Sequence, residues 1–229
     1  MSDKIYANKD MLKWSRETIG INPEQASRKL HFDLEDLIMI ENGELPVSYS
    51  KLEEMAELYG RPLAIFFFSR VPDEITPVKQ FRTLPEISFY EFDPNMHKLF
   101  RKALVMQMNI AELNENKSIF LNVGMDADNR NIKKSCDEIR RYLGVSLDMQ
   151  KKKNNISESL EIWREALNNA GISVFKDNFQ NDGYSGFSIY DDKFPIIFIN
   201  NNLSKNRQLF TLFHELSHVL FKISGMDID

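Results

Sequence analysis

The first seventy residues carry apolar positions at helical spacing, and capping residues divide them into five short predicted helices. Asn22 followed by Pro23 predicts one helix start, and Gly20 marks the end of the helix before it. The stretch that begins at Ser50 has the sequence of a capping box and predicts the start of the fourth helix. The last of the five, 63–67, has no polar face, so we expect it to be buried.

The third of these helices, capped by Asp33 and closed by Asn42-Gly43, combines an apolar stripe with four carboxylates. The stripe is Leu34, Leu37, Ile38 and Ile40, and the carboxylates are Asp33, Glu35, Asp36 and Glu41. No lysine or arginine lies between Lys29 and Lys51. We therefore expect an acidic surface here, as suits the start of a helix that faces solvent.

A proline-rich linker, 71–98, follows these helices. Its aromatic residues would be poorly placed in solvent, so we expect the linker to pack against the protein rather than to be flexible. Helical spacing then resumes, and beyond Gly171 the apolar positions alternate or run continuously, as in strands. The predicted helices are 94–114, 131–143 and 157–169, the predicted strands are 172–175, 184–190 and 194–199, and a last helix follows Ser204. The chain is therefore predicted to be α+β, with a helical domain over 1–70 and, over 99–229, a domain of helices with a small three-stranded sheet.

Composition and charge limit the compartment and the partners of the chain. No apolar run approaches the ~20 residues that span a bilayer, and the N-terminus lacks the apolar core of a signal peptide. The single cysteine, Cys136, is typical of a reducing compartment. These features predict a cytoplasmic protein without a membrane partner. The formal net charge of −5 gives no overall attraction to nucleic acid, although it does not exclude binding by a local patch.

Two N-terminal segments share one pattern: LKWSRETIGINPEQASRKL and DLEDLIMIENGELPVSYSKLEEMAELYGRPLAIFF. They resemble the Cro/C1-type (XRE) helix-turn-helix domain, which implies that the second and third helices form a DNA-reading pair. Phosphate contacts supply most non-specific affinity, and guanine is usually read by arginine or lysine, so the acidic third helix would be repelled. We therefore predict weak DNA binding. Gln25 and His31 remain candidate polar contacts, and stronger binding would need a second subunit or basic residues such as Arg28 and Lys29.

The last predicted helix contains HELSH, in which two histidines lie four residues apart. This spacing puts His214 and His218 on one helix face, within reach of one tetrahedral zinc ion. Glu215 is placed to take a proton from water that the metal activates. The alternative is two helix histidines with ordinary hydrogen bonds. We favour the metal site because the apolar residues around the motif would anchor the helix in a core, as a rigid site requires.

The residues around this motif, SGFSIY and PIIFINNNLSKNRQLFTLFHELSHVLF, resemble the core of the ImmA/IrrE family of zincin-like metallopeptidases. The resemblance covers about 160–221 and implies zinc held by His214 and His218, with Glu215 as the general base. It also implies a regulatory role, in which a partner such as a repressor is cleaved or antagonised in a mobile-element or stress-response circuit. An edge strand, here 194–200, would pair with an extended substrate.

A catalytic zinc ion usually has three protein ligands, and the motif supplies two. In families of this kind the third is an acidic residue some tens of residues after the second histidine. Asp227 and Asp229 are the only carboxylates downstream, and a frayed terminus would hold either one poorly. We expect Ser224-Gly225 to end the helix and the third ligand to lie beyond residue 229, so that this chain carries zinc weakly or not at all.

Three classes of function are consistent with the sequence. The first is a cytoplasmic zinc endopeptidase that acts on a partner regulator. The second is a helix-turn-helix transcription regulator whose metallopeptidase-like domain is a sensor or interaction module without proteolysis. The third is an interaction scaffold with neither activity. Tyr184 and Tyr190 are interpreted as ordinary sheet residues rather than as oxyanion donors of an enzyme.

Overall fold

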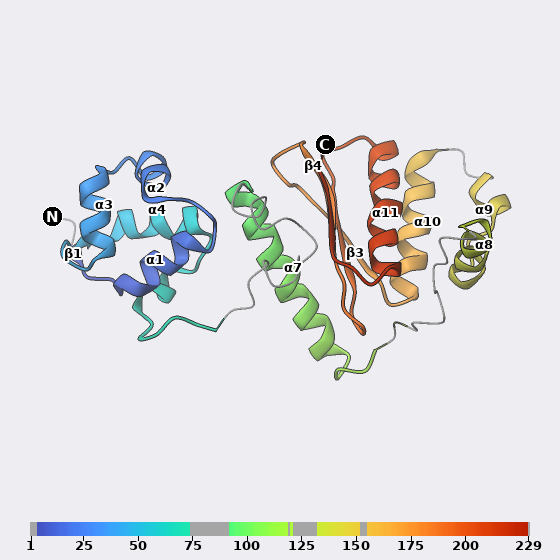
Figure 1. The fold of residues 1–229 in the computed structure, drawn as a ribbon, viewed down its shortest axis with the longest axis horizontal. Coiled ribbons are helices and arrows are strands. Elements are labelled where there is room, and N and C mark those ends of the chain that lie inside the picture. Colours follow the sequence, from blue (N-terminus) through green and yellow to red (C-terminus); the bar gives the residue numbers. More distant parts are fainter. Residues whose placement is uncertain (1–3, 74–91, 119, 121–131, 152–154, 229) are drawn as a thin grey trace. The chain divides into compact units, whose positions relative to one another are not determined.

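A computed structural model of the protein describes residues 4–73, 92–118, 120, 132–151 and 155–228. The chain forms two compact units, and each is described by itself (Figure 1). The first unit includes the described residues up to 100, and the second includes those from 101 onward. The predicted packing of the linker rests on Phe81, Phe89, Tyr90 and Phe92. The first three lie outside the described residues, and Phe92 is buried. Among the described helices, none is long and apolar enough to cross a membrane.

The first unit is built mainly from short helices. Its elements include β1 (Lys4–Ile5), α1 (Lys9–Glu17), α2 (Pro23–Leu30), α3 (Leu34–Glu41), β2 (Val47–Ser48), α4 (Tyr49–Tyr59) and the 3-10 helix η1 (Leu63–Phe67). The predicted start of α2 is confirmed, because Asn22 and Gln25 form a reciprocal capping box. The predicted start of α4 is wrong by two residues. Ser48 rather than Ser50 caps this helix, and its hydroxyl accepts a hydrogen bond from the Lys51 amide.

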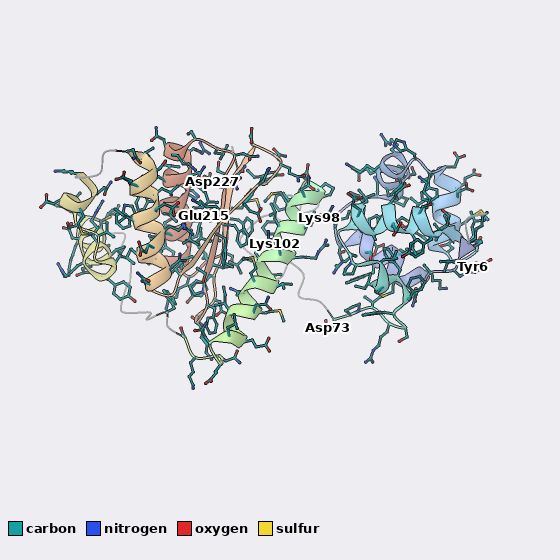
Figure 2. All side chains as sticks on the ribbon, turned by 180° about the vertical axis from the view of Figure 1, so that it is seen from behind. Tyr6, Asp73, Lys98, Lys102, Glu215 and Asp227 are labelled. Carbon is teal, nitrogen blue, oxygen red and sulfur yellow. The ribbon has the colours of Figure 1, made fainter. Side chains whose placement is uncertain are left out.

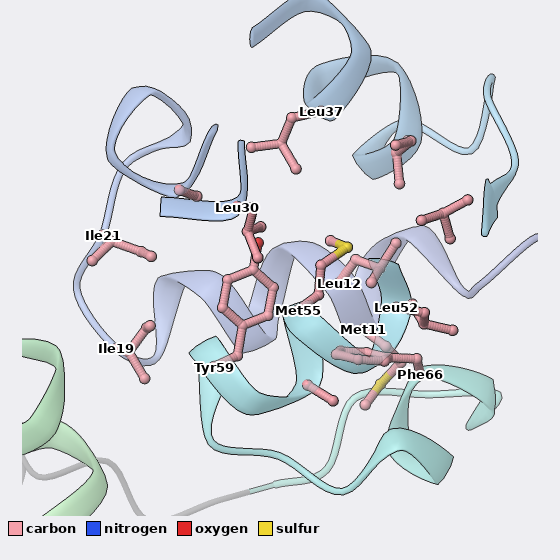
Figure 3. Packing of buried hydrophobic residues seen from close by; sticks show 14 residues of the cluster. Met11, Leu12, Ile19, Ile21, Leu30, Leu37, Leu52, Met55, Tyr59 and Phe66 are labelled. Atoms are coloured by element: carbon pink, nitrogen blue, oxygen red, sulfur yellow. The ribbon is translucent and has the colours of Figure 1, made fainter. Parts of the chain in front are cut away.

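Fourteen buried apolar side chains form the core of the first unit (Figure 3). Each helix from α1 to η1 contributes to it, among them α1 with Leu12, α3 with Leu37 and α4 with Tyr59. Helices this short are marginal alone, so packing on a shared core stabilises them. The prediction that the whole of η1 is buried is wrong. Phe66 is fully buried, but Phe67 is half exposed, because a single short turn can direct only part of its surface inward.

The surface of α3 also differs from the prediction. Ile38 belongs to the predicted apolar stripe but is 41% exposed. Glu41, predicted to be an acidic surface residue, is buried and pairs with Arg16 of α1. The Arg16 Nε atom donates to Glu41 Oε1 at 2.8 Å, and a terminal nitrogen donates to Oε2 at 2.9 Å. This bidentate pair joins α1 to α3, and the surface of α3 is less acidic than the sequence suggested.

The second unit is a four-stranded sheet covered by helices. Its elements are the later part of α7 (Pro94–Leu113), α8 (Ile132–Leu143), α9 (Leu147–Lys151), α10 (Ile156–Asn169), β3 (Ser173–Asp177), β4 (Tyr184–Ile189), β5 (Ile196–Asn200), α11 (Lys205–Leu220) and β6 (Gly225–Ile228). The strand order is β3-β5-β4-β6, and only β3 and β5 are parallel. Helices α10 and α11 lie on one side of the sheet and α7 on the other (Figure 1). The α+β class is thereby confirmed. This sheet has one strand more than predicted, and the first unit, predicted to be all-helical, contains the short two-stranded sheet of β1 and β2.

Strand β5 lies inside the sheet and is covered on both faces. Ile197 and Ile199 belong to the core beneath α10 and α11, whereas Phe198 stacks on Phe187 of β4, with ring centroids 5.1 Å apart. Successive side chains of a strand point to opposite faces, so burial of both faces requires the continuous apolar run of this segment. The interpretation of 194–200 as a substrate-binding edge strand is wrong, because β3 and β4 occupy both sides of β5.

The described chain ends in a strand where we expected a frayed helix end. Helix α11 ends at Leu220, and Gly225, expected to close the helix, begins β6 instead. β6 pairs antiparallel with β4, with Asp227 opposite Gly186. Its backbone is therefore held by the sheet, and the expectation of a frayed terminus is wrong for the described residues.

Candidate metal centre

Helix α11, which carries the HELSH sequence, is fixed at its start and along its buried face. Ser204 caps the start, where its hydroxyl accepts a hydrogen bond from the Arg207 amide at 3.3 Å. Leu212, Leu216 and Val219 lie in the core of the second unit. A helix anchored in this way holds its projecting side chains in a narrow range of orientations, as a metal site requires.

His214 and His218 lie one helical turn apart, and their side chains converge. Their Nε2 atoms are 3.1 Å apart, and their ring centroids are 4.9 Å apart. Two nitrogen ligands at about 2.0–2.1 Å from a tetrahedral ion lie about 3.3 Å from each other. The two imidazoles are therefore spaced for one shared ion. Both side chains are partly exposed, so an ion from solvent can reach them.

Glu215 lies on the buried side of α11, against β4 (Figure 2). Its Oε2 atom accepts a hydrogen bond from the Ser188 hydroxyl at 2.7 Å. Its Oε1 atom is buried and has no partner of normal hydrogen-bond geometry within the described ranges, although the Asp227 backbone also interacts with this carboxyl group and lowers its pKa. A buried acceptor without a well-formed hydrogen bond costs about 1–3 kcal/mol, so Oε1 can accept a hydrogen bond from water or substrate. Ligand atoms of His214, Glu215 and His218 all lie within 4.8 Å of one another, and we call these residues the HELSH cluster.

Burial controls the charge of this carboxyl group. Burial is the largest of the effects that raise the pKa of Glu215 to about 8, and the charge of Asp227 adds to it. The hydrogen bonds from the Ser188 hydroxyl and from the Asp227 backbone lower the pKa and so oppose it. A pKa near neutrality suits a general base, and a cation bound beside the carboxylate would lower this pKa again. Burial, together with the neighbouring His214, also lowers the pKa of His218. His218 therefore favours the neutral form that binds metal.

Two glycines allow the sheet to approach α11 beside the cluster. A Cβ atom on Gly225 of β6 would lie 2.3 Å from Cδ2 of His218. A Cβ atom on Gly186 of β4 would lie 2.5 Å from the Thr211 methyl carbon and 2.8 Å from the Phe198 carbonyl oxygen. No side chain fits at these distances, so the backbone of β6 packs directly on the His218 ring. A glycine inside a strand pattern often marks a place where another part of the chain comes close to the strand backbone. Gly186 could therefore have been identified from the sequence as such a place.

Asp227 of β6 faces α11 near Glu215 (Figure 2). Its Oδ2 atom accepts a hydrogen bond from the Thr211 hydroxyl at 3.3 Å and lies 3.7 Å from a terminal nitrogen of Arg207. Within the described ranges it does not join the HELSH cluster as a further metal-ligating residue. Asp229, the other downstream carboxylate, lies outside the described residues. A third ligand beyond residue 229 stays a prediction.

The structure brings the three residues singled out from the sequence together, and their roles as ligands and base stay predictions. Sequence reasoning missed Ser188, which β4 places against the glutamate, because an alternating strand pattern does not show what its polar face contacts. Tyr190 lies outside the cluster: its hydroxyl donates to Asp192 Oδ1 at 2.5 Å. This agrees with its interpretation as an ordinary residue of the sheet region.

Comparison with known families agrees with this site. Residues 167–227 match the model of peptidase family M78, described as the IrrE N-terminal-like domain. The match begins in α10, includes β3, β4, β5 and α11, and ends within β6. No curated protein and no solved structure matches the chain. An ImmA/IrrE metallopeptidase-like domain is thus supported for the C-terminal part, and the XRE resemblance of the N-terminal part stays a prediction.

Proposed function

We propose that the protein is a zinc-dependent endopeptidase that cleaves a partner protein, such as a repressor. The observation that carries this proposal is the convergence of two imidazole Nε2 atoms, 3.1 Å apart, beside the buried carboxyl group of Glu215. The family match over 167–227 supports a regulatory metallopeptidase. Zinc suits imidazole nitrogen ligands, whereas calcium and magnesium prefer oxygen, so zinc is the proposed metal.

In this proposal His214 and His218 hold the ion through Nε2, and Glu215 is the general base. Zinc, when bound, acidifies water and polarises the carbonyl group of the peptide to be cleaved. Oε1 of Glu215, which has no hydrogen bond of normal geometry within the described ranges, accepts a proton from the attacking water and passes it to the leaving amine. The Ser188 hydroxyl holds the other carboxylate oxygen and so limits the orientations of the carboxyl group.

The proposed substrate is an extended segment of the partner protein, placed beside β6. Among the described strands, β3 and β6 are the outer ones of the four-stranded sheet, and β6 packs on His218 through Gly225. A segment that adds to this edge would bring one of its peptide bonds close to the HELSH cluster. Pairing with β6 recognises backbone, so preference among substrates would depend on side chains that flank the paired segment.

Zinc binding and peptide cleavage test the proposal separately. With two histidine ligands the zinc affinity is expected to be weak, so equilibrium dialysis uses zinc in excess. His214→Ala should abolish saturable zinc binding, whereas Glu215→Gln should keep it. With zinc present, Glu215→Gln should lower cleavage of a quenched fluorescent peptide mixture by at least about a hundredfold. Glu165→Gln, an exposed position on α10, is the matched control. Cleavage that persists in Glu215→Gln would overturn the proposal.

A second candidate function is that of a helix-turn-helix regulator with weak DNA affinity. The arrangement of α2 and α3, two eight-residue helices joined by residues 31–33, supports this candidate. Glu35 and Asp36 remain exposed on α3, which argues against strong binding. Titration of the full chain with duplex DNA at several salt concentrations is the test. Nanomolar affinity that falls steeply with salt would contradict weak binding.

A further inference from the structure

A cavity of about 370 Å³ lies between α8, α10 and α11 in the second unit. Much of its lining is apolar and comes from Ile139, Trp163, Phe213, Leu216 and Leu220. Small-molecule pockets typically measure ~300–1,000 Å³, and an apolar cavity of about 150 Å³ can hold benzene. The cavity is therefore large enough for a small molecule with an extended apolar part.

This cavity uses a different face of α11 from the HELSH cluster. Glu215 is directed to β4, where it accepts the hydrogen bond from Ser188. Phe213 instead packs edge-to-face on Trp163 of α10, with ring centroids 4.9 Å apart. Phe213 and Leu216 line the cavity, whereas the residues of the cluster do not. An occupant of the cavity would therefore be distinct from a metal ion or a peptide substrate at the cluster.

One polar group of the lining, the Arg140 side chain, indicates what the occupant should carry. Trp163 is almost fully buried, and its Nε1 atom has almost no accessible surface, so the ring rather than the donor lines the cavity. The Arg140 guanidinium lies over the Trp163 ring, 5.0 Å from its centroid. Arg140 donates to the Val145 carbonyl and to the Gln150 side-chain oxygen, and no described carboxylate forms an ion pair with it. The lining thus offers a positive charge that no carboxylate of the described residues neutralises.

We propose that the cavity binds a small amphiphilic carboxylate, such as a medium-chain fatty acid. The apolar chain would contact Phe213 and Leu216, and the carboxylate would neutralise the Arg140 charge. An amine of the same shape would be repelled by Arg140. An alcohol would leave the guanidinium without a counter-ion, whereas a hydrogen bond to an ionised acceptor is about twice as strong as a neutral one.

Tryptophan fluorescence tests this proposal on the full chain. The chain has two tryptophans, so Trp14→Phe, a change in the first unit, leaves Trp163 as the only reporter. Decanoate, titrated below the concentration at which it forms micelles, should change the Trp163 emission in a saturable way. Decan-1-ol, which has the same chain length but no carboxylate, should bind at least about tenfold more weakly. This comparison needs no variant of the cavity and does not depend on whether the protein is a peptidase.

Two substitutions then assign the polar contacts. Arg140→Gln should weaken decanoate binding by about tenfold or more and leave decan-1-ol binding unchanged. Trp163→Phe keeps an aromatic ring beside Arg140 and removes only the buried donor, so it should change decanoate binding by less than about threefold. For this variant the readout is the alkylation rate of Cys136, the only cysteine, which is exposed at the cavity lining and should be protected by ligand. No saturable fluorescence change, or equal affinity for acid and alcohol, would overturn the proposal.

Discussion

Replacing Glu215 with glutamine should stabilise the metal-free protein at neutral pH, although it removes the proposed general base. The pKa of Glu215 is about 8 in the folded protein, against an ordinary value of 4.5. Between these two pH values the folded state binds a proton that the unfolded state has released. Raising the pH through this interval therefore favours unfolding. The protonated glutamate contributes full stability below pH 4.5, and this contribution is lost progressively up to about pH 8.

The magnitude follows from the distance between the two pKa values. One pH unit inside the interval changes the free energy of unfolding by about 1.4 kcal/mol, so the change from pH 4.5 to pH 7 is about 3 kcal/mol. Glutamine carries no charge to desolvate, and its carbonyl oxygen can still accept the hydrogen bond from Ser188. Relative to wild type, Glu215→Gln should therefore gain about 3 kcal/mol of stability between pH 4.5 and pH 7.

Urea unfolding with a metal chelator at the two pH values measures this gain. Both chains carry Trp14→Phe, so that Trp163 fluorescence reports on the second unit alone. Glu165→Gln, which alters an exposed carboxylate on α10, should change the unfolding free energy by less than about 0.5 kcal/mol at either pH. A Glu215→Gln effect of the same size at pH 4.5 and pH 7 would refute the reasoning that burial holds the carboxyl group protonated.

Three further substitutions test other contacts. Ser188→Ala removes a hydrogen bond to the ionised base, so its pKa should rise and the acidic limb of the pH–rate profile for peptide cleavage should move to higher pH. Gly225→Ala would place a Cβ atom 2.3 Å from the His218 ring, and equilibrium dialysis should show zinc affinity reduced by at least about tenfold; unchanged affinity would contradict the packing. Glu41→Gln leaves the buried charge of Arg16 without its partner, and urea unfolding of the first unit should show a loss of about 3–5 kcal/mol. The double change Arg16→Met with Glu41→Leu should lower the free energy of unfolding by much less. An equally large loss would show that the ion pair itself stabilises the fold.

Local signals predicted the helices of the first unit well because capping acts between residues close in sequence. Asn22 and Gln25 are three residues apart, and Gly20 adopts the positive φ that its position after α1 requires. The burial of Glu41 could not be predicted in this way. Its partner, Arg16, lies 25 residues away, and only the packing of α1 on α3 brings the two together.

Strand order was harder to predict than strand position, because local sequence patterns do not report contacts between distant segments. The alternating and apolar runs located β3, β4 and β5, because side-chain period depends on local backbone geometry. The pairing of β5 with both β3 and β4 depends on contacts between segments far apart in the sequence. β6 was missed because Gly225 was interpreted as a helix end. A glycine is equally suited to a strand that must pack on a neighbouring ring, and Gly225 does so against His218.

The surroundings of the HELSH cluster favour a metal site over two ordinary helix histidines. Ordinary histidines would need only hydrogen-bond partners. They would not require a carboxylate buried beside them with one oxygen that has no hydrogen bond of normal geometry in the described part of the chain. Nor would they require a glycine in β6 where the strand meets the His218 ring. Each of these features is unfavourable for stability by itself: burial penalises the charge of Glu215, and glycine weakens a strand. Unfavourable choices that gather around three residues of one helix, while Leu212, Leu216 and Val219 anchor the same helix in the core, are expected where function rather than stability selected the residues.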